Sequence, residues 1–220
     1  DPRVTLLSSV PAPTAVSWTG GSKPAVFAAW RGEGAVMRID LTDGDVRVLG
    51  AASLQVGGST DGARVRPSLL GGGPGGHLFV LSDVLREGRP ASTMLMELDP
   101  KDAGLLALAE EPGDCEVATW GWNPLLNVGI VGCRQSGDVL LYEPSMGEFI
   151  ARQQLVGSKE VQAVAVDPID GAAITLARRE SPFLIRYDLE ARKPRAWRFL
   201  GTGNYSLLLG DDGLLRVPRF

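Results

Sequence analysis

Short apolar runs alternate with turn-forming residues along the whole chain. Residues 25–30, 128–133 and 172–177 are apolar runs, and each is followed, after a polar corner, by a second run of similar length. Short runs bounded by Gly, Pro, Asn and Asp are typical of β-strands. The best helical stretch, 103–111, is short and better explained as a strand with loops. The pattern therefore predicts an all-β chain.

Two segments of the chain are copies of one unit. Residues 117–131 align without a gap with 161–175, at an offset of 44 residues (161 minus 117). Each copy contains two apolar runs joined by an Asn-Pro or Asp-Pro turn, which predicts a β-hairpin. A third and a fourth run follow in both copies. Four short antiparallel strands in a repeat of this length are typical of a β-propeller blade.

The third strand of this unit can be traced five times, because it ends on a polar or acidic residue before a turn. Each of the five is preceded by a plausible second strand. We therefore expect a single domain, an all-β propeller of about five four-stranded blades over residues 1–220. The expected blades cover approximately 14–50, 64–112, 115–157, 160–201 and, for the last, 205–220 together with 1–8.

The two ends of the chain predict how the ring closes. Residues 3–8 form a strand with no blade before it, and the third strand at 214–217 has no fourth strand after it. Pairing the two would close the ring and hide sheet edges. A ring with missing blades, or one completed by another chain, remains an alternative. The second blade departs from the repeat, since 71–76 and 85–92 are expected to enlarge its loops.

Three runs carry a resemblance to a known family. Residues 136–143, 33–40 and 211–217 resemble the Gly-containing turn and third strand of WD40 repeats, although the chain has no Trp-Asp dipeptide. The turn at 167–171, Asp-Pro-Ile-Asp-Gly, is similar to that of YVTN-type propellers. The chain thus resembles degenerate WD40-like or YVTN-like propellers. That resemblance implies a binding platform, usually for other proteins.

Charge is unevenly distributed along the chain. The formal net charge of −4 argues against a general nucleic-acid binder, which needs clustered Lys and Arg. Residues 178–220 nevertheless carry nine basic and five acidic side chains. This stretch is either a solvated blade face or a docking patch for an acidic partner or RNA. The candidate docking residues are Arg178, Arg179, Arg192, Lys193, Arg195 and Arg198.

Two cysteines allow a single disulfide. If the hairpin of the third blade turns at 123–125, Trp122 faces Leu126 and Cys115 faces Cys133. A bridge between the cysteines would stabilise the fold by about 3 kcal/mol and imply an oxidising compartment. Alternatively, both are small buried apolar residues. The chain has no Cys-x-x-Cys pair or Cys/His cluster, so the sequence does not support a zinc site.

Signals of catalysis are weak. His77 is the only histidine, no nucleophile motif accompanies it, and we expect it to be structural. Asp167, Asp170 and Asp188 fall at turns, where Asp caps backbone amides. Asp40, Asp99 and Asp188 recur at one blade position, which indicates a repeated structural bond. The glycines at 71–76 lack the Gly-Lys-Ser/Thr of a phosphate-binding loop, and a flexible loop is expected there. We therefore expect no catalytic residue, metal or cofactor.

The tryptophans divide into two groups. Trp120 and Trp122 lie on one side of their strand and are expected to pack in the core, because blades are covered on both faces. Trp18, Trp30 and Trp197 are less constrained. One of these at a blade edge could anchor a partner, since interfaces are enriched in Trp.

These observations favour a non-enzymatic scaffold that binds other protein subunits within a larger assembly. The alternative is an exported propeller that binds a small molecule or acts as a metal-dependent, lactonase-like hydrolase. No run of about 18 apolar residues indicates a membrane span. The chain begins at Asp1 without Met, which suggests a removed targeting segment or a partial chain and leaves the compartment open.

Overall fold

The computed structural model describes residues 12–20, 24–32, 34–49, 63–155, 159–167, 169–178, 181–201, 205, 207–209 and 215–219. Every regular element within these ranges is a β-strand, apart from one short 3₁₀ turn, η1 (Pro74–Gly76). The strands form four antiparallel sheets of four strands each and one two-stranded sheet. The expected all-β architecture of four-stranded antiparallel sheets is confirmed.

The four large sheets follow one another along the chain. The first contains β1 (Ala15–Thr19), β2 (Ala25–Trp30), β3 (Ala35–Asp40) and β4 (Val46–Leu49). The second contains β5 (Arg64–Gly72), β6 (Leu78–Arg86), β7 (Arg89–Leu98) and β8 (Leu105–Pro112). The third contains β9 (Val117–Asn123), β10 (Val128–Cys133), β11 (Asp138–Glu143) and β12 (Glu148–Gln154). The fourth contains β13 (Glu160–Val166), β14 (Ala173–Arg178), β15 (Pro182–Asp188) and β16 (Lys193–Phe199).

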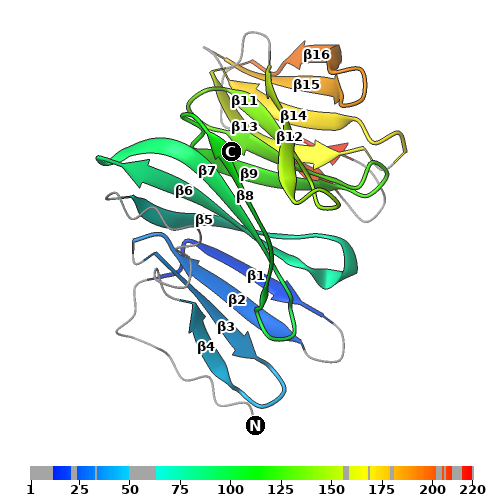
Figure 1. The fold of residues 1–220 in the computed structure, drawn as a ribbon. Coiled ribbons are helices and arrows are strands. Elements are labelled where there is room, and N and C mark those ends of the chain that lie inside the picture. Colours follow the sequence, from blue (N-terminus) through cyan, green and yellow to red (C-terminus); the bar gives the residue numbers. More distant parts are fainter. Residues whose placement is uncertain are drawn as a thin grey trace.

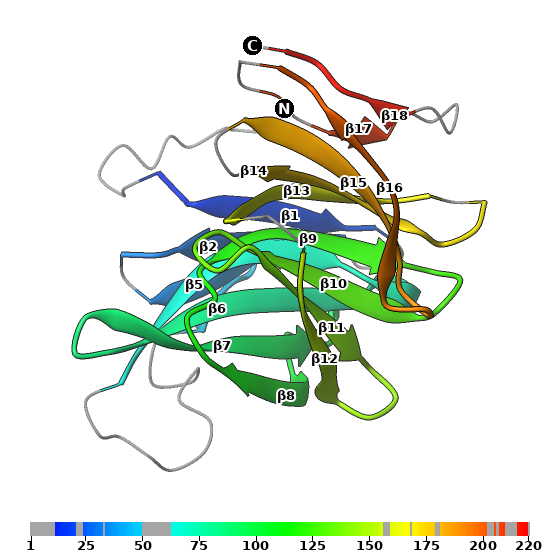
Figure 2. The ribbon, with the colours of Figure 1, turned by 90° about the horizontal axis from the view of Figure 1, so that it is seen from above.

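Successive sheets lie face to face, as Figure 1 shows from β1–β4 at one end to β13–β16 at the other. The first strand of each sheet contacts the first strand of the next: β1 with β5, β5 with β9, and β9 with β13. Figure 2 shows the strands from above, with β1, β9 and β13 crossing the middle of the picture. Within the described residues, the first and fourth sheets do not pack against each other in this way.

The region of the expected fifth blade contains β17 (Leu208–Leu209) and β18 (Leu215–Arg216), which pair with each other. A bridge between Tyr205 and Arg219 lies beside them. The strand expected at 3–8 lies outside the described residues. Ring closure through that strand therefore stays a prediction.

Three apolar clusters fill the spaces between neighbouring sheets. Phe27 and Leu78 contribute to the cluster between the first and second sheets, and Ile130 and Ile185 to the one between the third and fourth. Each of the two middle sheets is covered on both faces, so its strands are apolar on both sides. This packing explains the continuous apolar runs in the sequence.

The expected core role of Trp120 and Trp122 is confirmed. Both pack in the cluster between the second and third sheets, where the Phe79 ring centroid lies 4.9 Å from that of Trp120 and 5.8 Å from that of Trp122. Trp120 Nε1 also donates a hydrogen bond to the carbonyl of Gly72, at 3.1 Å. A Cβ at Gly71 would lie 2.2 Å from the Trp120 ring, so only glycine fits there. The expected loop at 71–76 is thus in part the end of β5.

The expected enlarged loop at 85–92 is wrong. These residues belong to β6 and β7, which continue to a two-residue turn with Arg86 opposite Arg89. Glu87 and Gly88 form the turn with φ angles of 50° and 78°. Positive φ at both positions suits the right-handed twist of a hairpin, and Gly supplies it without strain. The second sheet therefore has a long hairpin in place of a loop.

The expected register of the β9–β10 hairpin is also wrong. Trp122 lies opposite Gly129, and Asn123 lies opposite Val128. The cause is the Asn123 side chain, whose Oδ1 accepts hydrogen bonds from the amides of Leu125 and Leu126 at 3.0 and 3.1 Å. The turn consequently takes four residues, 124–127, where the sequence argument allowed three.

Asn123 also joins two sheets, which generates a prediction. Its Nδ2 donates to the carbonyl of Gly171 at 2.7 Å, and the side chain is fully buried. Replacing Asn123 by Ala leaves that carbonyl and two turn amides without partners. We expect Asn123→Ala to lower the free energy of unfolding by about 1–3 kcal/mol in urea denaturation. Asn127→Gly is the matched control, because exposed Asn127 already has a φ of 54°. Equal losses in both variants would contradict the assigned role.

Candidate interaction surfaces

One face of the first sheet is apolar at every position. The residues that point away from the second sheet share this face because they lie directly opposite one another across β1–β4, as do Trp18, Val26, Ile39 and Val46. We call it the first-sheet outer face. Its residues are Val16, Trp18, Val26, Ala28, Trp30, Ala35, Met37, Ile39, Val46 and Val48.

The first-sheet outer face is uncovered over its two edge strands. The exposed fractions are 70% for Trp18, 60% for Val16, 59% for Val48 and 52% for Val46. On the other side of the same sheet, Phe27 is fully buried against the second sheet. The central strands of this face are half-buried or buried, and apolar side chains exposed along both of its edges are typical of an interaction surface. Trp18 was predicted from the sequence as a possible anchor, but the face around it was not.

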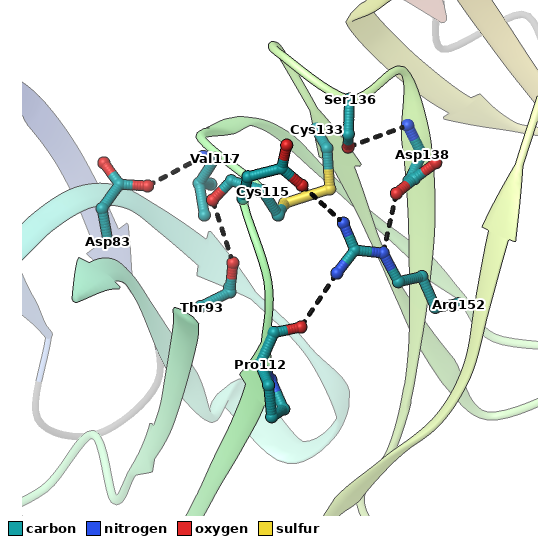
Figure 3. The surroundings of a disulfide bond; sticks show 10 residues. Asp83, Thr93, Pro112, Cys115, Val117, Cys133, Ser136, Asp138 and Arg152 are labelled. Atoms are coloured by element: carbon teal, nitrogen blue, oxygen red, sulfur yellow. Dashed lines mark hydrogen bonds and ion pairs between the residues drawn. A yellow bond between two sulfur atoms is a disulfide. The ribbon is translucent and has the colours of Figure 1, made fainter. Parts of the chain in front are cut away.

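A network of ion pairs joins three sheets at one end of their first strands. Arg31 follows β2, and its Nη2 lies 2.9 Å from Asp83 Oδ2 in β6 and 3.0 Å from Glu116 Oε1 before β9. Asp83 is completely buried, and its Oδ1 accepts the amide of Val117 at 2.9 Å. Figure 3 shows the hydrogen bond between Asp83 and the amide of Val117. A buried carboxylate needs such partners to offset the loss of water. The network therefore holds the relative positions of the sheets.

Cys115 and Cys133 form a disulfide in the structure, with their Cα atoms 4.8 Å apart (Figure 3). Both are buried. The strand partner of Cys133 is Val117, because the pairing shifts at a β-bulge between Gly132 and Cys133. Cys115 lies just before β9, outside the paired residues. The cysteines meet although the register expected for them was wrong.

The disulfide fastens the segment between the second and third sheets. Thr93 Oγ1 donates to the carbonyl of Cys115 at 3.2 Å. Arg152 reaches the same segment from β12, donating to the carbonyl of Pro112 at 2.9 Å, while its Nε donates to Asp138 of β11 at 2.7 Å (Figure 3). The connection between these two sheets is therefore held by a covalent bond and by hydrogen bonds on either side.

Of the six basic residues expected to form a docking patch, the five that the structure describes are not gathered in one place. Arg178 ends β14 and lies opposite Pro182, whereas Lys193 lies opposite Asp188 at the other end of the fourth sheet. Arg195 Nη2 forms an ion pair with Asp188 at 2.6 Å. Arg192 and Arg198 are exposed, and Arg179 lies outside the described residues.

The turn carboxylates of the fourth sheet cap backbone amides, as expected. Asp167 accepts the amide of Ile169 at 2.9 Å, and Asp188 that of Ala191 at 2.9 Å. Asp40 and Asp99 make the same kind of bond to residues two positions on. A structural bond repeated at one blade position is thereby confirmed for Asp40, Asp99 and Asp188.

Arg186 adds charge partners to two of these carboxylates. Its Nη2 lies 2.9 Å from Asp167 Oδ2 and 2.6 Å from Asp170 Oδ2. The hydrogen bond from Arg186 and the amide of Ile169 lower the pKa of Asp167. The amide of Ala172 and then Arg186 lower the pKa of Asp170. These contacts explain the carboxylates without a bound ligand.

His77 lies beside a buried carboxylate. Its Nδ1 is 2.6 Å from Glu97 Oε1, and the Tyr142 hydroxyl donates to Glu97 Oε2 at 3.2 Å. Burial, together with the charge of Glu97, raises the pKa of Tyr142. Among the described residues, no group of three His, Cys, Asp or Glu side chains could hold a metal ion. No helix in the same ranges is long and apolar enough to cross a bilayer.

A polar cavity opens where the third and fourth sheets meet the end of the chain. Its volume is about 460 Å³, and its lining includes Arg134, Glu160, Gln162 and Tyr205. This cavity was not predicted from the sequence. The available signal was the repeat itself, because the cavity residue Arg134 has a counterpart 44 residues on, Arg178, which lies opposite the cavity residue Glu160.

The disulfide generates a prediction for stability. Replacing Cys115 and Cys133 together by Ser should lower the free energy of unfolding by about 3 kcal/mol, because the unfolded chain loses a loop closure. Urea denaturation of both proteins measures the difference. Thiol counting on wild-type protein denatured without reductant should find no free thiol. Two free thiols in native material would contradict the bridge.

The Arg186 contacts generate a prediction for pH dependence. The folded-state pKa values of Asp167 and Asp170 lie below their unfolded values. Their contribution to stability is therefore present above the unfolded pKa, about 3.9, and lost as the pH falls through the folded pKa. We expect Arg186→Gln to lower the urea midpoint at neutral pH and to converge with wild type in acid. A difference that persists in acid would contradict this account, and Arg192→Gln is the control.

No family model and no curated protein matches the sequence of this chain. Hydrazine synthase from Kuenenia stuttgartiensis is similar in structure, with a TM-score of 0.72 at 14% identity over 98% of this chain and 58% of that one. A chain of the mitotic checkpoint complex is similar with a TM-score of 0.58 at 16% identity over 86% of this chain and 52% of that one.

Both of these solved structures have β-propeller or WD40-type folds. At 14% and 16% identity, the similarity concerns the fold alone. This chain spans little more than half the length of either neighbour. Its four-stranded antiparallel sheets and their face-to-face order therefore place it among propeller-like all-β folds.

Proposed function

We propose that the chain is a non-enzymatic β-propeller scaffold that binds other proteins. The observation that carries the proposal is the first-sheet outer face, which is apolar throughout and open at Trp18, Val16, Val46 and Val48. Burying an exposed side chain of this size stabilises a complex by about 1.5–3 kcal/mol before the costs of association. A partner covering this face would remove several such side chains from water.

The packing inside the chain indicates what kind of structure fits there. The second sheet packs on the other side of the first, and the same face-to-face packing recurs between the second and third sheets and between the third and fourth. A flat apolar sheet face accepts another sheet at about 10 Å. We therefore propose that the partner presents a β-sheet to the first-sheet outer face. Such a partner would take the place that the fifth blade has in a closed ring of about five blades, so closure through 3–8 is the alternative to this proposal.

The test uses a variant that makes this face polar. Trp18→Glu combined with Val48→Lys should abolish association with the partner protein in quantitative affinity purification and cross-linking from the native source. Cross-links are expected at Lys101, because the neighbouring Asp102 carbonyl contacts Arg47 of β4. The stability of the isolated chain should change by less than about 1 kcal/mol, because both side chains are exposed.

Ile169→Glu is the matched control, since Ile169 is 89% exposed in a turn of the fourth sheet. The control should keep the partner. If the double variant keeps the partner, the assigned surface is wrong. If it instead unfolds the isolated chain, the face is covered from within by the chain itself, as a closed ring would require.

A second candidate function is an exported propeller that binds a small molecule. The Cys115–Cys133 disulfide favours it, because such bonds persist in oxidising compartments. The polar cavity beside Arg134 also favours it, since its volume of about 460 Å³ lies in the range of ligand pockets. Recovery of a lone monomer from the native source would favour this function over the scaffold.

A further inference from the structure

One type of residue recurs where the second strands of the sheets end. Arg31 directly follows β2, Arg134 directly follows β10, and Arg178 is the last residue of β14. In the second sheet the same end carries Arg64 and Arg66 at the start of β5, where Arg66 lies opposite Asp83 of β6. We call these five residues the inner arginine row.

The carboxylates near the row are shared between arginines. Asp83 Oδ2 lies 2.9 Å from Arg31 Nη2 and 3.4 Å from Arg66 Nη2. Glu116 Oε1 lies 3.0 Å from Arg31 Nη2 and 3.5 Å from Arg134 Nη1. Two carboxylates thus serve three guanidinium groups, each of which has five N–H donors. Counting only the described residues, the network keeps positive charge and unused donors after its internal pairs have formed.

Two members of the row are open to a ligand. The Arg134 side chain is 51% exposed. Its distance to Glu116, 3.5 Å, is longer than the 3.0 Å between Arg31 and Glu116. Arg178 is exposed, and within the described ranges it forms no ion pair. Between these arginines, Glu160 lies opposite Arg178 on β13 and borders the polar cavity together with Gln162. The row therefore offers two accessible guanidinium groups beside a hollow that has polar walls.

We propose that the inner arginine row binds an acidic polypeptide segment, whose Asp or Glu carboxylates pair with Arg134 and Arg178. Guanidinium groups bind carboxylates through two parallel hydrogen bonds. Arg31 and Arg66 are held by buried Asp83 and supply fixed positive charge behind them. Carboxylates spaced along a peptide can avoid Glu116 and Glu160, which a continuous phosphate backbone cannot do. This site is separate from the first-sheet outer face and goes beyond the scaffold proposal.

The test measures binding of a fluorescein-labelled octaglutamate peptide by fluorescence anisotropy at about 50 mM NaCl, where screening is modest. We expect Arg134→Gln combined with Arg178→Gln to weaken binding at least about tenfold, as the loss of charge-assisted hydrogen bonds requires. Arg192→Gln combined with Lys193→Gln is the matched control. It removes the same charge from the other end of the fourth sheet and should change binding less than about threefold.

Several outcomes would overturn the proposal. These are no binding of the peptide to wild type, equal weakening by both double variants, and tighter binding of a U8 RNA than of the peptide. Arg178→Gln alone guards against misfolding, because exposed Arg178 has no ion pair among the described residues; it should weaken binding at least about threefold. The Trp18→Glu, Val48→Lys variant should bind the peptide normally, so failure of the scaffold proposal is distinguishable from failure of this one.

Discussion

Face-to-face packing of apolar sheets is the interaction on which the rest of this structure depends. Each four-stranded sheet is too small to bury its own apolar side chains, and only a neighbouring sheet can cover them. Phe79 illustrates the result, since it is completely buried among Trp120, Trp122 and Tyr142 of the next sheet. The first-sheet outer face, at the end of the stack, does not meet this requirement, because no described sheet covers it. The proposed function follows from that one unmet requirement.

Polar contacts fix the sheets in the positions that apolar packing allows. Asn123 connects the third and fourth sheets through Gly171, and Arg38 connects the first and second through the carbonyl of Pro100, at 3.2 Å. Asp83 gathers contacts from three sheets. Because these groups are buried, each is costly to leave without a partner, and together they favour one arrangement over sliding of one sheet on another. Arginines held in this way can also face outward as a preformed surface.

The strands were predictable from the sequence, because short apolar runs bounded by turn-forming residues determine strands through neighbouring residues alone. Residues 25–30 and 128–133 were expected as strands, and the structure has β2 and β10 there. Errors arose where a single side chain or a backbone angle decided the outcome. Asn123 lengthened a turn, and Gly88 allowed a hairpin to continue through an expected loop. The first-sheet outer face could not be predicted, because the apolar residues around Trp18 look the same whether or not another sheet covers them.

The scaffold proposal depends on the exposure of Trp18. Hydroxyl-radical footprinting with mass spectrometry measures this exposure directly. If the first-sheet outer face binds a partner, Trp18 is oxidised rapidly in the isolated chain, where it is 70% exposed, and its oxidation slows sharply in the assembled complex. Trp120, which packs against Phe79, should react slowly in both states and provides the internal reference. Slow oxidation of Trp18 in the isolated chain, or an equal rate in chain and complex, would contradict the account.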